Sequence, residues 1–70
     1  MKKLNPGDLV RLNLEYYDKG TCVHYGIGLL LEEYLDEADE CMLWQKVYWF
    51  NLKRISSFSR AGVVVLLVSF

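Results

Sequence analysis

Two glycines, Gly26 and Gly28, precede an unbroken run of three leucines at residues 29–31. Leucine content alone would favour a helix, but each glycine would cost about 1 kcal/mol inside one. In a β-strand, by contrast, glycine marks a bulge, a sharp bend or the close approach of another backbone. We therefore predict a strand at residues 27–32 that bends at the two glycines, with its leucines covered on both faces.

Further strands are indicated by alternating polarity and by β-branched or aromatic residues. Residues 10–16 alternate with a period of two, which is typical of a half-buried strand. The acid-dense residues 35–41 are expected to form a solvated loop. Other segments that favour strands are 22–25 (a short bridge), 42–50, 53–59 and 63–68. Several short strands separated by turns predict one all-β domain over residues 1–70, as a small five-stranded barrel, because closure removes exposed strand edges.

The composition of this short chain indicates that a partner covers part of its surface. The chain has 70 residues and a hydrophobic fraction of 53%. A domain of this size buries only about 60% of its unfolded surface. Apolar side chains that the core cannot hold must lie against a partner or remain exposed.

Charge is distributed unevenly along the sequence. The formal net charge is −1, whereas nucleic-acid-binding domains are usually basic. Most acidic residues fall within residues 32–41, and residues 42–70 contain basic residues but no acid. The longest apolar run, residues 63–68, is far shorter than the roughly 18 residues of a membrane helix. We expect no secretory signal either, and two cysteines without one indicate free thiols in a reducing compartment.

Four segments together resemble an SH3-like small barrel: PGDLVRL at 6–12, GIGLLLEE at 26–33, KVYWF at 46–50 and VVVLL at 63–67. The first two also resemble the entry and the glycine-marked strand of KOW-type modules. The combination looks like small SH3-like proteins of tailed bacteriophages, which share a Gly-Asp-Leu-Val opening, a Gly-Ile-Gly strand and a Val-x-Trp strand. The likeness spans about residues 5–68.

This resemblance implies a structural protein rather than an enzyme. Phage proteins of this kind serve as capsid decoration, connector, neck or baseplate components. We therefore expect a virion protein, assembled in the host cytoplasm, that binds other virion proteins or itself. The same expectation includes no cofactor, no metal and no membrane partner.

Aromatic residues and the C-terminal strand supply the predicted contact surface. Trp and Tyr are frequent interface anchors, and so small a barrel cannot bury all of them. Residues 63–68 are apolar on both strand faces, although the core can take only one, which predicts a subunit contact at residues 64–70. The expected contact residues are Tyr16, Tyr17, Tyr34, Trp44, Tyr48, Phe50, Leu66, Val68 and Phe70.

A KOW-like nucleic-acid-binding module is the alternative. Lys53, Arg54 and Arg60 could contact phosphates, with Phe50 and Phe58 as stacking platforms for bases. Three cations are few for this purpose, and the acidic run opposes them. We therefore rank nucleic acid below protein as the partner.

Catalytic and metal-binding interpretations have weaker support. Cys22 and His24 would share one face of a strand, but no third group is identified that would orient the histidine. Together with Cys41 they give only three ligands and no close cysteine pair, whereas structural zinc needs four ligands. The acidic run lacks the central glycine and the ligand spacing of an EF-hand loop.

Overall fold

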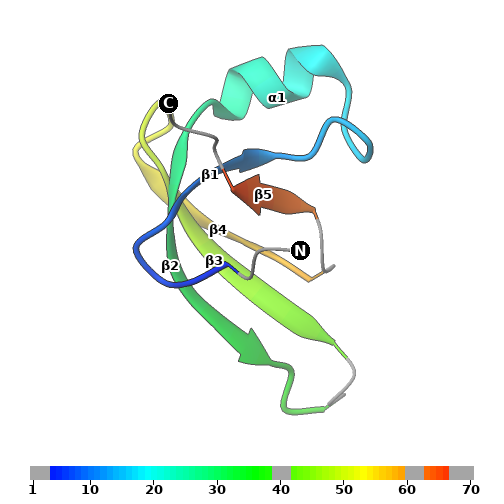
Figure 1. Cartoon of the computed structure of the whole chain (residues 1–70), viewed down its shortest axis with the longest axis vertical. Helices are drawn as coiled ribbons and strands as arrows, with labels where there is room; N and C mark the ends of the chain where they lie inside the picture. The colour runs from blue at the N-terminus through cyan, green and yellow to red at the C-terminus, as the bar shows by residue number, and fades with distance from the viewer. Residues whose placement is uncertain (1–3, 39–41, 60–62, 67–70) are drawn as a thin grey trace.

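The computed structural model describes residues 4–38, 42–59 and 63–66. These residues form one antiparallel sheet of five strands in the order β4-β3-β2-β1-β5, with a short helix between the first two strands of the chain (Figure 1). The elements are β1 (Leu9–Leu12), α1 (Lys19–Tyr25), β2 (Gly28–Leu35), β3 (Leu43–Trp49), β4 (Arg54–Phe58) and β5 (Val64–Leu66). The prediction of a small, mostly β fold with five strands is confirmed. The described strands do not close into a barrel.

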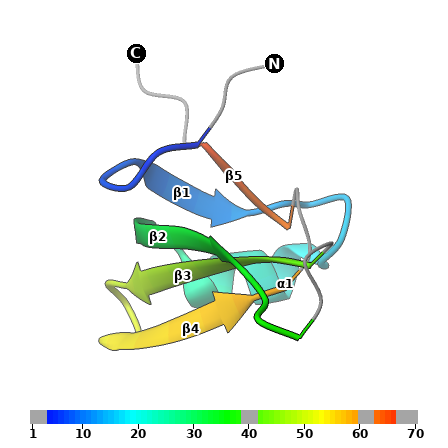
Figure 2. The ribbon, with the colours of Figure 1, turned by 90° about the horizontal axis from the view of Figure 1, so that it is seen from below.

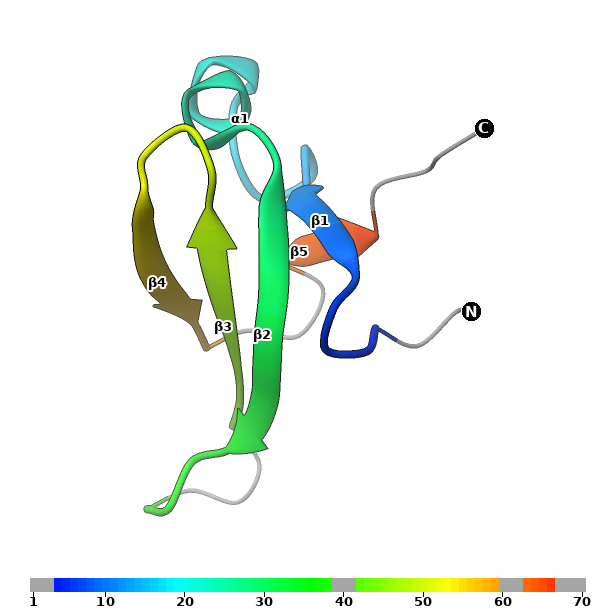
Figure 3. The same ribbon diagram turned by 90° about the vertical axis from the view of Figure 1, so that its left-hand side faces the viewer.

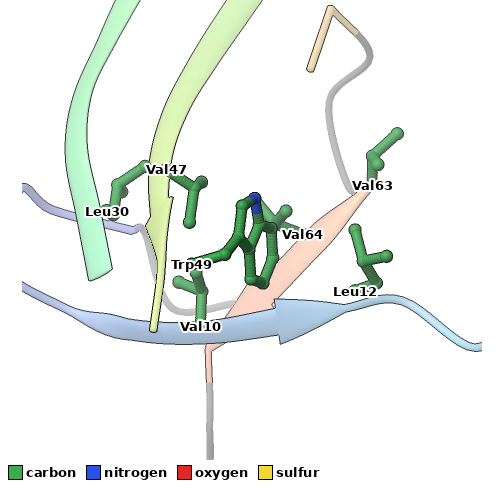
Figure 4. Close-up of a cluster of buried hydrophobic side chains, with 7 residues drawn as sticks. All are labelled: Val10, Leu12, Leu30, Val47, Trp49, Val63 and Val64. Atoms are coloured by element: carbon green, nitrogen blue, oxygen red, sulfur yellow. The ribbon is translucent and has the colours of Figure 1, made fainter. Parts of the chain in front are cut away.

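The sheet bends between β2 and β1, so that β1 and β5 lie across one face of the other three strands (Figures 2 and 3). β1 pairs with β2 only at its N-terminal end, where Val10 is opposite Gly28, and pairs with β5 from Val10 to Leu12. The hydrophobic core fills the space inside this bend (Figure 4). Its buried members are Val10, Leu12, Leu30, Val47, Trp49, Val63 and Val64.

Both predicted glycine positions matter, but for different reasons. Gly26 has φ +69°, and its backbone N–H donates to the Cys22 carbonyl oxygen at 2.9 Å, which ends α1. Positive φ is readily available only to glycine. Gly28 opens β2 and lies beneath the side chains of Val47 and Trp49, which would clash with a Cβ at this position. One glycine therefore ends a helix, and the other lets two strands pack closely.

The predicted short strand at residues 22–25 is wrong, because these residues belong to α1. Asp18 caps the helix: its Oδ1 accepts a hydrogen bond from the Thr21 backbone N–H at 3.1 Å. Cys22 and Tyr25 then pack against the core. A cap at one end, a glycine at the other and a buried face outweigh the weak strand preference of four residues.

Two strand boundaries also differ from the prediction. β1 ends at Leu12 rather than residue 16, because the Asn13 side chain accepts from the Glu15 N–H at 2.9 Å and its carbonyl accepts from the Tyr16 N–H at 3.0 Å. These bonds make a turn. β2 continues to Leu35, beyond the predicted end at residue 32, so the first residue of the predicted loop at 35–41 belongs to a strand. Residues 39–41 of that loop lie outside the described residues.

The leucine run is not covered on both faces as predicted. The pairing of β2 with β3 shifts register between Leu30 and Glu32, where one extra residue forms a bulge. Leu30 is buried, Leu29 is half-buried and Leu31 is exposed. β3 and β4, in contrast, lie within a residue or two of their predicted ranges, 42–50 and 53–59.

The cap at Asp18 leads to a pH prediction. Hydrogen bonds from Thr21 hold the pKa of the Asp18 carboxyl below its usual value. Because the pKa of Asp18 is lower in the folded than in the unfolded state, the charged carboxylate stabilises the fold at pH values above the unfolded-state pKa, near 3.9. This stabilisation is lost as the pH falls through the folded-state pKa. Asp18→Asn keeps a capping oxygen that does not titrate. We expect the melting temperature of the wild type to fall toward that of Asp18→Asn between about pH 5 and pH 2. A difference that stays constant with pH would contradict this role.

Candidate interaction surfaces

A row of apolar side chains crosses the outer face of the sheet, opposite the core. In an antiparallel sheet, directly opposed residues share a face, and Leu9 opposes Leu29, Leu29 opposes Tyr48, and Tyr48 opposes Ile55. Leu9 is 44% exposed and Ile55 is 54% exposed. The Phe50 ring meets the Tyr48 ring edge to face at 5.5 Å. We call these five residues the outer sheet face.

A second surface is an aromatic pocket of about 290 Å³. It is lined by three of the predicted contact residues: Tyr16 and Tyr17, which are neighbours in the sequence, and Trp44 from β3. The Trp44 indole donates from Nε1 to Asp36 Oδ2 at 2.8 Å. The remaining lining residues are Ser57, Phe58, Ser59 and Val63, so the pocket lies where the end of β4 approaches the start of β5.

The far halves of β2 and β3 form a hairpin arm, residues 32–38 and 42–46, that extends beyond β1 at the bottom of Figure 1. Tyr34, another predicted contact residue, lies on it with Lys46 Nζ 5.9 Å from its ring centroid. Lys46 Nζ also lies 3.5 Å from Glu32 Oε1. Gln45, which is buried, donates to Glu33 Oε2 at 2.9 Å. These contacts hold the two strands of the arm in register.

The third surface, an apolar cleft of about 330 Å³ between α1 and β1, was not predicted. Val23, on its wall, is 67% exposed. Sequence reasoning missed the cleft because residues 22–25 were assigned to a strand; the capping residue Asp18 before residues 19–25 was the available signal. The cleft is lined by Arg11, Leu14, Lys19, Cys22, Val23, Gly26 and Ile27.

The structure brings together only some of the residues that were predicted to contact nucleic acid. Lys53 and Arg54 are exposed at the turn between β3 and β4, near Phe50 in the chain, and Lys53 has φ +52°. Phe58 packs against the core, where its ring meets the Trp49 ring at 5.9 Å. Phe58 is half-buried and ends β4, whereas Arg54 begins that strand. Arg60 lies outside the described residues.

The predicted C-terminal contact can be assessed only in part. Val63 and Val64 are both buried, although the alternation placed them on opposite faces; Val63 precedes β5, and its carbonyl accepts from the Asn13 N–H at 2.7 Å. The Leu66 backbone pairs with Val10 in the sheet. The Leu66 side chain, Val68 and Phe70 lie outside the described residues.

Cys22 and His24 do not share a face as predicted, because they lie two positions apart on a helix. Cys22 is half-buried, with Sγ 3.8 Å from the Leu12 carbonyl oxygen, whereas His24 is exposed and its ring meets that of Tyr25. Within residues 4–38, 42–59 and 63–66, no three His, Cys, Asp or Glu side chains are grouped as a metal site would require. No helix in this part of the chain is long and apolar enough to cross a membrane.

No protein-family model, no curated protein sequence and no solved structure matches this chain.

Proposed function

We propose that the chain is a non-enzymatic structural module of a tailed-bacteriophage particle, which binds other virion proteins through the outer sheet face. The observation that carries this proposal is the apolar row from Leu9 to Ile55. An antiparallel sheet with one face on the core usually presents polar side chains on the other. Here the outer face presents leucine, isoleucine and aromatic side chains, which is the composition of an interaction site.

An SH3-like arrangement of the strands is part of the proposal. In the order β4-β3-β2-β1-β5, the two edge strands are β4 and β5. A closed barrel of this type would bring these edge strands together. The aromatic pocket supports this arrangement, because Phe58 at the end of β4 and Val63 just before β5 line the same cavity. The role in a particle rests on the resemblance of residues 6–12, 26–33, 46–50 and 63–67 to the phage proteins.

The alternative, a KOW-like nucleic-acid-binding module, has one observation in its favour. Lys53 and Arg54 are exposed close in sequence to Phe50, which is also exposed, so two cations and one aromatic ring occupy the same turn region. Phe58, in contrast, is half-buried and packs against the core, which weighs against this alternative. Phosphate-binding proteins lose affinity linearly with the logarithm of salt concentration. A nanomolar, salt-dependent complex with an oligonucleotide at physiological ionic strength would favour the alternative.

The proposed function predicts incorporation into particles that depends on the outer sheet face. We expect quantitative mass spectrometry of purified particles of the encoding phage to detect the wild-type chain in fixed ratio to other structural proteins. Leu9→Thr combined with Ile55→Thr should lower its incorporation at least about tenfold, because two apolar anchors are lost. Both side chains are exposed and threonine suits strands, so the fold should change little.

The matched control is Leu9→Ile combined with Ile55→Val, which keeps the face apolar and should leave incorporation unchanged. Urea unfolding of all three proteins should show midpoints that correspond to differences below about 1 kcal/mol. Absence of the wild-type chain from purified particles, or equal incorporation of the double threonine variant, would contradict the proposal.

A further inference from the structure

The apolar cleft is lined by two positively charged side chains as well as by apolar ones. Its wall is formed by Leu14, Val23 and Ile27, all of them exposed. Arg11 and Lys19 also line it, and neither makes an ion pair with a carboxylate among the described residues. The cleft therefore suits a ligand that combines one apolar group with negative charge.

Residues 35–37 of the hairpin arm, called the tip below, have that composition. Leu35 ends β2 with 57% of its surface exposed, opposite Leu43 in the hairpin. Asp36 follows, and its carboxylate accepts bonds from Trp44 Nε1 at 2.8 Å and from the Ala38 N–H at 2.7 Å. These bonds fix the conformation of the chain just after Leu35. Glu37 is exposed and has no ion-pair partner in the described part of the chain.

The tip and the cleft cannot meet within one molecule. β2 starts beside the cleft, after Ile27, and ends at the tip, so the two sites are separated by about 26 Å of extended strand. They lie toward opposite ends of the molecule, whose longest extent is 33 Å (Figure 1). One copy can therefore present its arm to the cleft of the next copy while its own cleft stays open.

We propose that the chain self-associates head to tail, with Leu35 of one copy inserted in the apolar cleft of a second copy and Glu37 facing the Lys19 and Arg11 side chains there. The charge complementarity between the two ends identifies a second copy as the occupant. Such a contact is heterologous, so repetition gives a ring where the rotation closes and an open filament where it does not. The contact uses neither the outer sheet face nor the aromatic pocket, and both remain available for other proteins.

The experiment is sedimentation of the purified chain with charge reversals at each end. The weight-average mass of the wild type should rise above the monomer mass of 8.2 kDa between about 10 and 300 μM protein. The rise should be larger at about 50 mM salt than at about 500 mM, because exposed charges are screened. Glu37→Lys alone and Lys19→Glu alone should each weaken association at least about tenfold.

An equimolar mixture of the two variants should restore association. In the mixture, the unchanged arm of the Lys19→Glu chain meets the unchanged cleft of the Glu37→Lys chain, and the two altered sites also have opposite charges. Leu35→Ser should abolish association, and no partner variant should rescue it. Lys53→Glu, which reverses a charge outside the cleft, is the control and should associate like the wild type. Lys19→Glu places an acid in the first turn of α1, where it does not oppose folding.

A wild type that remains monomeric at low salt, or association that Leu35→Ser and both charge reversals leave intact, would overturn the proposal. NMR shifts at Val23 and Ile27 on adding decanoate to a monomeric wild type would instead identify an anionic amphiphile as the occupant, which also overturns it. These outcomes are separate from those of the particle experiment: a monomer that is still incorporated through the outer sheet face leaves the proposed function standing.

Discussion

Replacing Trp49 with alanine is expected to leave a large fraction of the molecules unfolded at 25 °C. Trp49 is fully buried, and its ring meets Tyr25 and Phe58 edge to face with centroids 5.2 and 5.9 Å away. Truncating a buried tryptophan costs about 3–5 kcal/mol. A domain of this length has roughly 4–10 kcal/mol of stability in total, and its small core places it toward the lower end.

Trp49→Phe provides the matched comparison. Trp49 Nε1 is buried and has no hydrogen-bond partner among the described residues. An unpaired buried donor costs about 1–3 kcal/mol, and phenylalanine removes this donor while it keeps most of the ring contacts. Urea unfolding followed by far-ultraviolet circular dichroism should therefore show Trp49→Phe to lose less than half as much stability as Trp49→Ala. Equal losses, or a loss below about 1 kcal/mol for alanine, would show that the ring is not central to the core.

The strands whose ranges could be predicted are those that their own residue pattern indicates, without reference to the rest of the fold. β3 is rich in aromatic and β-branched residues, and β4 is a more polar segment in which Ile55 alternates with its neighbours. The two strands pair as a hairpin across residues 50–53, and their ranges follow from the sequence within a residue or two. The faces of the leucine run could not be predicted, because the bulge after Leu30 resets the alternation. A bulge depends on pairing with another strand, and the alternation of a single strand does not reveal it.

The helix was missed because its stability depends on its surroundings. A helix of seven residues is marginal by itself, and α1 is held by its cap at Asp18, by Gly26 and by contacts of Tyr25 with Trp49 and Phe58. The apolar cleft requires this helix, so it was missed as well. Tyr16, Tyr17 and Trp44 were identified because excess aromatic residues are visible in composition, but their meeting in one pocket depends on the bend of the sheet.

At Gly28, even one added methyl group should have a large effect on stability. Gly28 opposes Trp49 across the β2–β3 pair, and both residues are buried. A Cβ at residue 28 would lie 2.7 Å from Trp49 Cε3 and would also clash with Val47 Cγ1. Neither neighbour can move aside easily, because both are fully buried in the core. Because Gly28 has no Cβ, the Trp49 ring can occupy the space above it.

We expect Gly28→Ala to cost about 1–3 kcal/mol and Gly28→Val about 3 kcal/mol, since added methyl groups overpack a core that is already filled. Gly20→Ala is the control, because it is the same substitution in α1, where the nearest described atom beyond the helix backbone and the chain neighbours would be Asp18 Oδ2, at 3.7 Å. That variant should gain about 0.5 kcal/mol from reduced freedom of the unfolded chain and from helix propensity. Urea midpoints that move in opposite directions for the two alanine variants would support close packing at Gly28. A neutral Gly28→Ala would mean that β2 can shift away from Trp49 at little cost, which would contradict close packing at this position.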